Sequence, residues 1–234
     1  MTTSSLPAPP TTAAEQPSRG TGALMLTLAG GAMIAGSLLY VAGMVTSPPQ
    51  DSPAAADYIA ALGRDEGRTT LSAVLLHYGN LALALAWLAA PALVRGRRGR
   101  VPTVAGALVS AIGLVTVAGF VLFDYWTGAI GRELDAATAL GLFEAVGANA
   151  GVGVVGLLTL FGLLGPVVGY AGLARAGVTG WWLLLPVVGC LAASAVIPFS
   201  PPVHGALALV GAVAPVVLGR RMIARSRAEA AVTA

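Results

Sequence analysis

The stretch Leu71–Arg100, LSAVLLHYGNLALALAWLAAPALVRGRRGR, decides the fold. It opens with an apolar run suited to a bilayer, because about 20 apolar residues of helix cross the roughly 30 Å hydrocarbon core. Four arginines, at positions 95, 97, 98 and 100, end the run. Each would cost on the order of 3 kcal/mol at the bilayer centre, and arginine-rich connections stay in the cytoplasm. We therefore expect a transmembrane helix over 71–94 with its arginine-rich end inside the cell.

One face of this predicted helix carries all of its strongly polar groups. Residues at spacings of three and four share that face: Ala73, His77, Asn80, Ala84, Trp87 and Pro91. Polar groups in hydrocarbon are costly unless they are hydrogen-bonded, so we expect this face to contact other helices or a cavity.

The composition of the whole chain indicates the same class of protein. Of 234 residues, 56% are hydrophobic and only 10% are charged, whereas soluble domains carry about 25% charged residues. The sequence therefore predicts an all-α, polytopic membrane helix bundle in contact with the lipid bilayer. A single cysteine, Cys190, excludes an intrachain disulfide and a Cys-rich metal or iron–sulfur site.

Apolar runs predict six transmembrane helices in one domain over residues 21–223. The expected spans are about 22–45, 71–94, 102–123, 148–174, 180–197 and 203–218. Residues 1–20 are rich in Ser, Thr and Pro and predict a disordered cytoplasmic tail, and residues 224–234 predict a basic cytoplasmic tail. Short helices are expected outside the membrane, over Ala54–Leu62 and Glu133–Val146.

The distribution of charge supports both termini in the cytoplasm. In this topology the inner segments hold ten arginines and two acids, and the outer segments hold three arginines and eight acids. Because topology explains where the arginines lie, the pI of about 9.5 does not indicate nucleic-acid binding.

Two local patterns predict helix contacts. Gly106, Ser110 and Gly113 form a narrow small-residue face on span three, and Gly165-x-x-x-Gly169 on span four fits a close-packing motif. The first two outer loops also share an Asp-Tyr pair followed by a Gly-Arg pair. This similarity is either a trace of duplicated two-helix units or a chance match in a chain rich in Ala and Gly.

Polar residues gather in the predicted outer half of the bundle and along its outer rim, which suggests a small outward-facing polar pocket. The candidate residues are Ser37, Tyr40, His77, Asn80, Asp124, Glu144, Asn149 and His204. Each has a plainer interpretation as helix-packing contact or as a solvated group at a helix end. No catalytic pattern is present, so the sequence favours a protein that is not an enzyme.

A metal or haem centre is an alternative expectation. His77 and His204, with Asp124 or Glu144, supply ligand types that Zn²⁺ accepts. The histidines lie in no recognised metal-binding spacing, and His204 is expected nearer the rim than His77. The simpler interpretation is that His77 bonds a neighbouring helix and His204 is solvated, with no cofactor.

The layout as a whole is a polar tail, a span, a short outer helix, an arginine-terminated span and a second acidic outer helix. It resembles small six-span integral membrane proteins of unknown function from high-GC Gram-positive bacteria. The resemblance implies a bacterial cytoplasmic membrane and six helices, and it implies no activity.

Three functions remain open from sequence. The first is a membrane protein that acts through helix packing with itself or with a membrane partner. The second is a small transporter or channel-like subunit, suggested by Pro166, Pro186 and Pro215 within spans. The third is a metal- or haem-binding membrane enzyme that uses His77 and His204.

Overall fold

A computed structural model describes residues 19–231. In this range every regular element is a helix, which confirms the all-α class. The α-helices are α1 (Arg19–Thr46), α2 (Ala55–Arg64), α3 (Glu66–Trp87), α4 (Arg100–Val121), α5 (Phe123–Glu133), α6 (Ala136–Gly147), α7 (Ala150–Arg175), α8 (Leu184–Val196), α9 (Pro201–Gly211) and α10 (Val213–Ala231). The 3-10 helices are η1 (Ala90–Leu93) and η2 (Trp181–Leu183).

Five stretches of the described chain are long and apolar enough to cross a membrane. They are Thr21–Thr46, Glu66–Leu93, Arg100–Glu133, Ala150–Arg175 and Pro201–Ala231. Each contains most or all of one predicted span. The remaining predicted span, 180–197, corresponds to the apolar segment Trp181–Val196, which falls in a shorter class of 10–17 residues. The chain is therefore a multi-pass helical membrane protein in contact with lipid.

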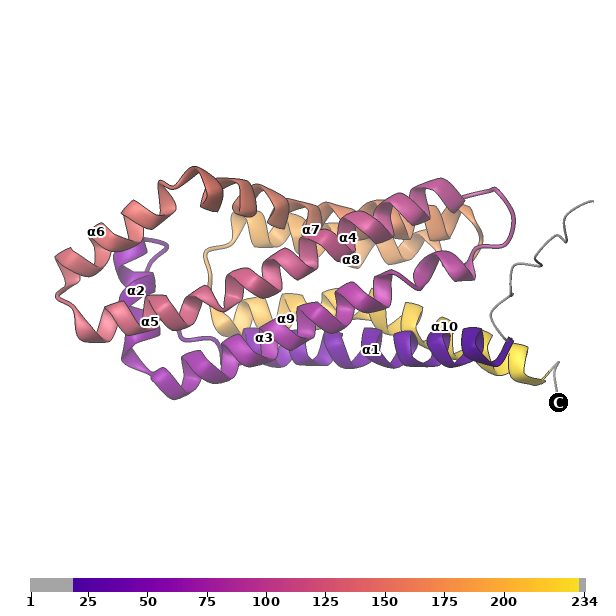
Figure 1. The fold of residues 1–234 in the computed structure, drawn as a ribbon, viewed down its shortest axis with the longest axis horizontal. Coiled ribbons are helices and arrows are strands. Elements are labelled where there is room, and N and C mark those ends of the chain that lie inside the picture. Colours follow the sequence, from indigo (N-terminus) through magenta and orange to yellow (C-terminus); the bar gives the residue numbers. More distant parts are fainter. Residues whose placement is uncertain (1–18, 232–234) are drawn as a thin grey trace, which may run out of the picture.

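The long helices run lengthwise along the molecule (Figure 1). Helices α2, α5 and α6 gather at one end, and the start of α1 lies with the end of α10 at the other. Neighbouring contacts run in the order α1, α3, α4, α7, α8, α9 and back to α1, so these helices form a closed ring. Helix α10 packs beside α1.

The connections between the spans are more helical than the sequence predicts. The expected short outer helices are present as α2 and α6, and the stretch that begins at Phe123 forms a further helix, α5. Helix α5 packs against α2, which gives it a partner that local sequence does not reveal. The predicted basic tail begins inside α10, which continues to Ala231. The predicted tail over residues 1–20 lies outside the described residues, except that α1 begins at Arg19.

The predicted sixth span is divided into two helices. Helix α9 ends at Gly211 and α10 begins at Val213. Pro215 follows immediately, and its ring clashes with the carbonyl four residues earlier, at Gly211, while it offers no N–H for a helical hydrogen bond. Proline chemistry therefore accounts for the break. Helix α7 continues across Pro166.

Glycines let the helix backbones approach closely. A Cβ atom at Gly113 of α4 would overlap the Gly162 backbone of α7, and a Cβ at Gly106 would overlap Gly169. On the other side of the ring, a Cβ at Gly30 of α1 would lie 2.6 Å from the Gly219 oxygen of α10. The small-residue faces predicted on spans three and four therefore pack against each other within one chain.

The largest buried cluster joins both sides of the ring. Trp87 of α3 and Tyr170 of α7 meet edge to face, with ring centroids 5.0 Å apart. Met33, Leu218 and Met222 extend the cluster between α1 and α10. Several of its members, such as Ala90, Leu173 and Met222, lie close in the chain to the arginine-rich turns.

We expect Gly113→Ala to destabilise the protein by about 2 kcal/mol or more, because the added methyl group forces α4 and α7 apart. Gly119→Ala is the matched control on the same helix, since a Cβ there meets nothing within 4 Å. Chemical unfolding in detergent micelles measures both variants. Equal stability of the two would contradict the close α4–α7 contact.

Candidate functional site: a central cavity

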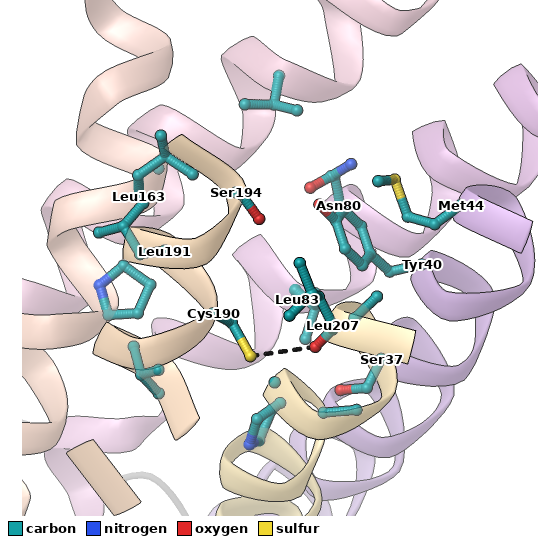
Figure 2. A pocket seen from close by; sticks show the side chains of 18 of the residues that line it. Ser37, Tyr40, Met44, Asn80, Leu83, Leu163, Cys190, Leu191, Ser194 and Leu207 are labelled. Carbon is teal, nitrogen blue, oxygen red and sulfur yellow. Dashed lines mark hydrogen bonds between the residues drawn. The ribbon is translucent and has the colours of Figure 1, made fainter. Parts of the chain in front are cut away.

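A cavity of about 570 Å³ lies inside the ring of helices. We call it the central cavity, and its walls come from α1, α3, α4, α7, α8, α9 and the start of α10. Figure 2 shows Tyr40 and Asn80 on one side of it and Cys190 and Ser194 on the other. Most of the remaining lining is Leu, Val, Ala, Met, Phe, Trp and Pro.

Four of the eight residues predicted for a polar pocket line the central cavity: Ser37, Tyr40, Asn80 and His204. Ser37 and Tyr40 come from α1, Asn80 from α3 and His204 from the first turn of α9. Residues 167 positions apart in the chain therefore share one space (204 minus 37).

Two of the polar side chains in the lining, Ser37 and Asn80, donate hydrogen bonds to backbone carbonyls of their own helices. The Ser37 hydroxyl donates to the Met33 carbonyl at 2.7 Å, and the Asn80 amide nitrogen donates to the Leu76 carbonyl at 2.7 Å. Such bonds to the preceding turn satisfy a donor without help from another helix. The side-chain oxygen of Asn80 keeps its capacity to accept a hydrogen bond, because among residues 19–231 it has no protein partner.

His204 lies at one end of the central cavity and is 7% exposed. Its Nδ1 atom is 3.3 Å from both the backbone nitrogen and the backbone oxygen of Ser200. The Phe199 ring lies against the His204 ring in a tilted arrangement, with centroids 5.0 Å apart. His204 is therefore a packed histidine in the cavity wall, not a solvated residue at the rim as the simpler sequence interpretation expected.

The other four predicted residues do not line the central cavity. His77 Nδ1 is 2.8 Å from the Ala118 carbonyl of α4. Asp124 accepts a hydrogen bond from the Tyr58 hydroxyl. Glu144 is exposed, and the Asn149 side chain caps the start of α7 by accepting from Gly151 N at 2.8 Å.

The residues suggested for a metal are thus held by separate partners. His77 bonds α4, His204 bonds its own turn, and Asp124 bonds α2. Within residues 19–231 no three His, Cys, Asp or Glu side chains are grouped so that they could hold an ion. The described geometry supplies no convergent ligand set from these three side chains.

Sequence reasoning missed the most informative lining residue, Tyr170. It is 2% exposed, and its hydroxyl has no hydrogen-bond partner among residues 19–231. A buried hydroxyl without a partner costs about 1–3 kcal/mol, so it is uncommon in a well-packed interior. A lone tyrosine inside an apolar run gave no signal of this, because only the fold shows that α3 and α7 enclose it.

Cys190 and Ser194 of α8 are the other polar residues that sequence reasoning left out. The Cys190 thiol donates to the Leu207 carbonyl at 3.1 Å, which ties α8 to α9. Ser194 is exposed and also lines the central cavity. Within the described chain no Arg, Lys, Asp or Glu lines the cavity, so its walls carry no permanent charge.

The lining of the central cavity reaches the surface of the described chain along α7 and α8. Leu163 of α7 is 47% exposed and belongs to the lining, and the lining residues Ser194 and Ala195 of α8 are exposed as well. No residue of α8 is buried. These exposed lining residues lie on apolar helices.

A separate polar contact joins α2 to α5 at the end of the molecule where α2, α5 and α6 gather. The Tyr58 hydroxyl donates to Asp124, and burial raises the pKa of Tyr58 well above its ordinary value, with the Asp124 charge raising it further. A Cβ at Gly63 of α2 would lie 2.9 Å from the Gly131 backbone of α5. The two Asp-Tyr and Gly-Arg motifs noted in the sequence are thus brought face to face.

Comparison with protein-family models, with curated proteins and with solved structures finds no match to this chain.

We expect Tyr170→Phe to raise the stability of the ligand-free protein by about 1 kcal/mol, because it removes a buried hydroxyl that has no protein partner. Tyr78→Phe is the control, since Tyr78 is exposed on α3. Unfolding of both variants in lipid-free detergent tests this expectation. A loss of stability in Tyr170→Phe would show that the hydroxyl has a partner in the folded protein.

Proposed function

We propose that this membrane protein binds a largely apolar small molecule in the central cavity. Its volume, about 570 Å³, lies within the range of ligand sites, about 300–1,000 Å³. Ligand sites are mostly apolar with a few hydrogen-bonding groups, and the lining has this character. The observation that carries the proposal is that Tyr170 belongs to the lining of this space and that its buried hydroxyl has no partner among residues 19–231.

The lining also limits the chemistry of the ligand. An ionised ligand finds no opposite permanent charge in the described walls, and burying an unpaired charge is strongly unfavourable. The Asn80 oxygen accepts a hydrogen bond, and the Tyr170 hydroxyl donates or accepts one. The ligand is therefore an uncharged lipid-like molecule that carries a hydroxyl or carbonyl group, and it reaches the cavity from the bilayer between α7 and α8.

Transport of that molecule is a second candidate function. The central cavity extends from His204 at the start of α9 to Pro215 beyond the break at Ala212, so it follows the divided span over much of its length. Divided spans beside a cavity are typical of transporters. Uptake of the ligand into proteoliposomes, absent when the cavity is filled by mutation, would distinguish transport from binding alone.

Action through self-association receives less support. The glycine faces that suggested it, on spans three and four, are occupied by the α4–α7 contact of the same chain. A membrane partner or a second copy would have to use other surfaces.

The topology that we propose has six crossings with both termini in the cytoplasm of a bacterium. Contacts at the two ends of the bundle support a sixth crossing by Trp181–Val196. Gly172, just before this segment, packs against Thr103 near the arginine-rich turn, and Gly205, just after it, packs against Val45 at the far end of α1. The arginine asymmetry supports the cytoplasmic position of that turn.

Cysteine labelling tests this topology. In a Cys190→Ala background, we expect Ala137→Cys and Pro198→Cys to react with a membrane-impermeant maleimide in intact cells, and Arg97→Cys to react only after permeabilisation. Labelling of Arg97→Cys from outside would invert the orientation, and failure of Pro198→Cys to label from outside would contradict the sixth crossing.

Filling the central cavity tests the proposed function. Gly211 lines the cavity, and a Cβ there meets only Cys190, at 3.7 and 3.8 Å. We expect Gly211→Leu to fold and to reduce cross-linking to a photoreactive long-chain alcohol by about tenfold, because its side chain occupies the ligand volume.

The matched control is Gly189→Leu, since Gly189 is exposed on α8 and a Cβ there meets nothing within 4 Å. Mass spectrometry of the cross-linked peptides should locate the label on lining residues of the unmodified protein. Equal labelling of both leucine variants would contradict binding in the central cavity.

A further inference from the structure

A second hollow, of about 390 Å³, lies at the arginine-rich end of the bundle. We call it the basic pocket. Three segments far apart in the chain form it: the turn after η1, the turn after α7 and the middle of α10. The residues that matter for its chemistry are Arg95, Arg221, Arg225, Leu93, Val178 and Ala224.

The basic pocket holds more positive than negative charge. Arg225 donates from Nε to the Glu229 carboxylate at 2.6 Å. Arg95 and Arg221 are exposed, and neither has a carboxylate within ion-pair distance among residues 19–231. Three arginines against one glutamate leave a local excess of two positive charges. Arg221 and Arg225 lie one turn apart on α10, so their like charges repel each other in the absence of an anion.

The basic pocket also lies at the depth where membrane phosphates are found. The apolar part of α10 ends at Gly219, and the arginines begin at Arg220. Trp181 and Trp182, which follow the α7 turn closely, are 59% and 53% exposed. Exposed tryptophans mark the boundary between hydrocarbon and headgroups. Leu93 and Val178 give the basic pocket an apolar wall beside its arginines.

We propose that the basic pocket binds a phosphate group, with Arg95 and Arg221 donating hydrogen bonds to its oxygens. Guanidinium groups match phosphate geometry with paired N–H donors, and they stay charged at any physiological pH. Arg225 adds charge from the same helix face while Glu229 holds its Nε. The phosphate comes either from the headgroup of an anionic phospholipid, whose chains continue past Leu93 and Val178 into the bilayer, or from a free phosphate in solution.

The test compares two double variants of the full chain. Arg95→Gln with Arg221→Gln removes the proposed donors, and Arg97→Gln with Arg98→Gln removes the same charge from exposed arginines that do not line the basic pocket. Native mass spectrometry counts phosphatidylglycerol retained from nanodiscs of phosphatidylcholine mixed with phosphatidylglycerol. A parallel arm measures thermal stabilisation of the detergent-solubilised protein by inorganic phosphate, with chloride at equal ionic strength as reference.

We expect binding in at least one arm to weaken about tenfold or more in the Arg95/Arg221 variant and to change little in the Arg97/Arg98 variant. An effect in the lipid arm alone identifies a phospholipid headgroup, and an effect in the phosphate arm alone identifies a free phosphate. A third variant, Ala224→Leu, keeps every charge and fills the space between Arg221 and Arg225, so it should also reduce binding. Equal losses in both double variants, no binding by the unmodified protein in either arm, or full binding by Ala224→Leu would overturn the proposal.

Discussion

The close contact between α4 and α7 is the constraint on which the rest of the structure depends. A Cβ atom at Gly106, Gly113 or Gly162 would overlap the backbone of the opposite helix, and one at Gly169 would overlap the Trp87 ring. In a membrane, helices gain little from hiding apolar surface from lipid, so close packing of this kind supplies much of the attraction between them. A similar glycine contact joins α1 and α3 at Gly36 and Gly79. Two tight helix pairs therefore frame the molecule, and α3 and α4 connect them.

The central cavity is a consequence of that frame. Helices α8 and α9 complete the ring, but α8 has no buried residue and contacts its neighbours sparsely compared with the two tight pairs. Helix α7 packs its glycines against α4, and its residues Gly162, Leu163, Pro166 and Tyr170 line the cavity that α8 borders on another side.

The two ends of the bundle differ in chemistry. At one end, α2, α5 and α6 form a cap with buried apolar residues Ile59, Ile130 and Ala139 and with the Tyr58–Asp124 hydrogen bond. At the other end, Arg95 from the turn after η1 and Arg221 and Arg225 from α10 line a hollow, and Glu229 pairs with one of these three arginines. The end formed by α2, α5 and α6 covers the ends of the long helices. The arginine-rich end has the charge for the anionic ligand that we propose. The proposed ligands of the two cavities accordingly differ, one uncharged and lipid-like and the other a phosphate.

The sequence by itself determined the helical class, the membrane location and most helix positions, because apolar runs of membrane length and arginine-rich turns are local patterns. It also indicated which faces of spans three and four are narrow, although it did not show that they pack against each other. Only the tertiary structure decided which polar residues share a space. Ser37, Tyr40, Asn80 and His204 meet in one cavity, whereas His77, chosen on equal grounds, bonds a carbonyl on α4. The proposed roles of Tyr170 and Arg221 depend on residues that lie near them in space but far away in the chain. The helical period determines on which face of a helix a side chain lies. Packing between distant segments determines which helix that face contacts, and no local sequence pattern encodes that contact.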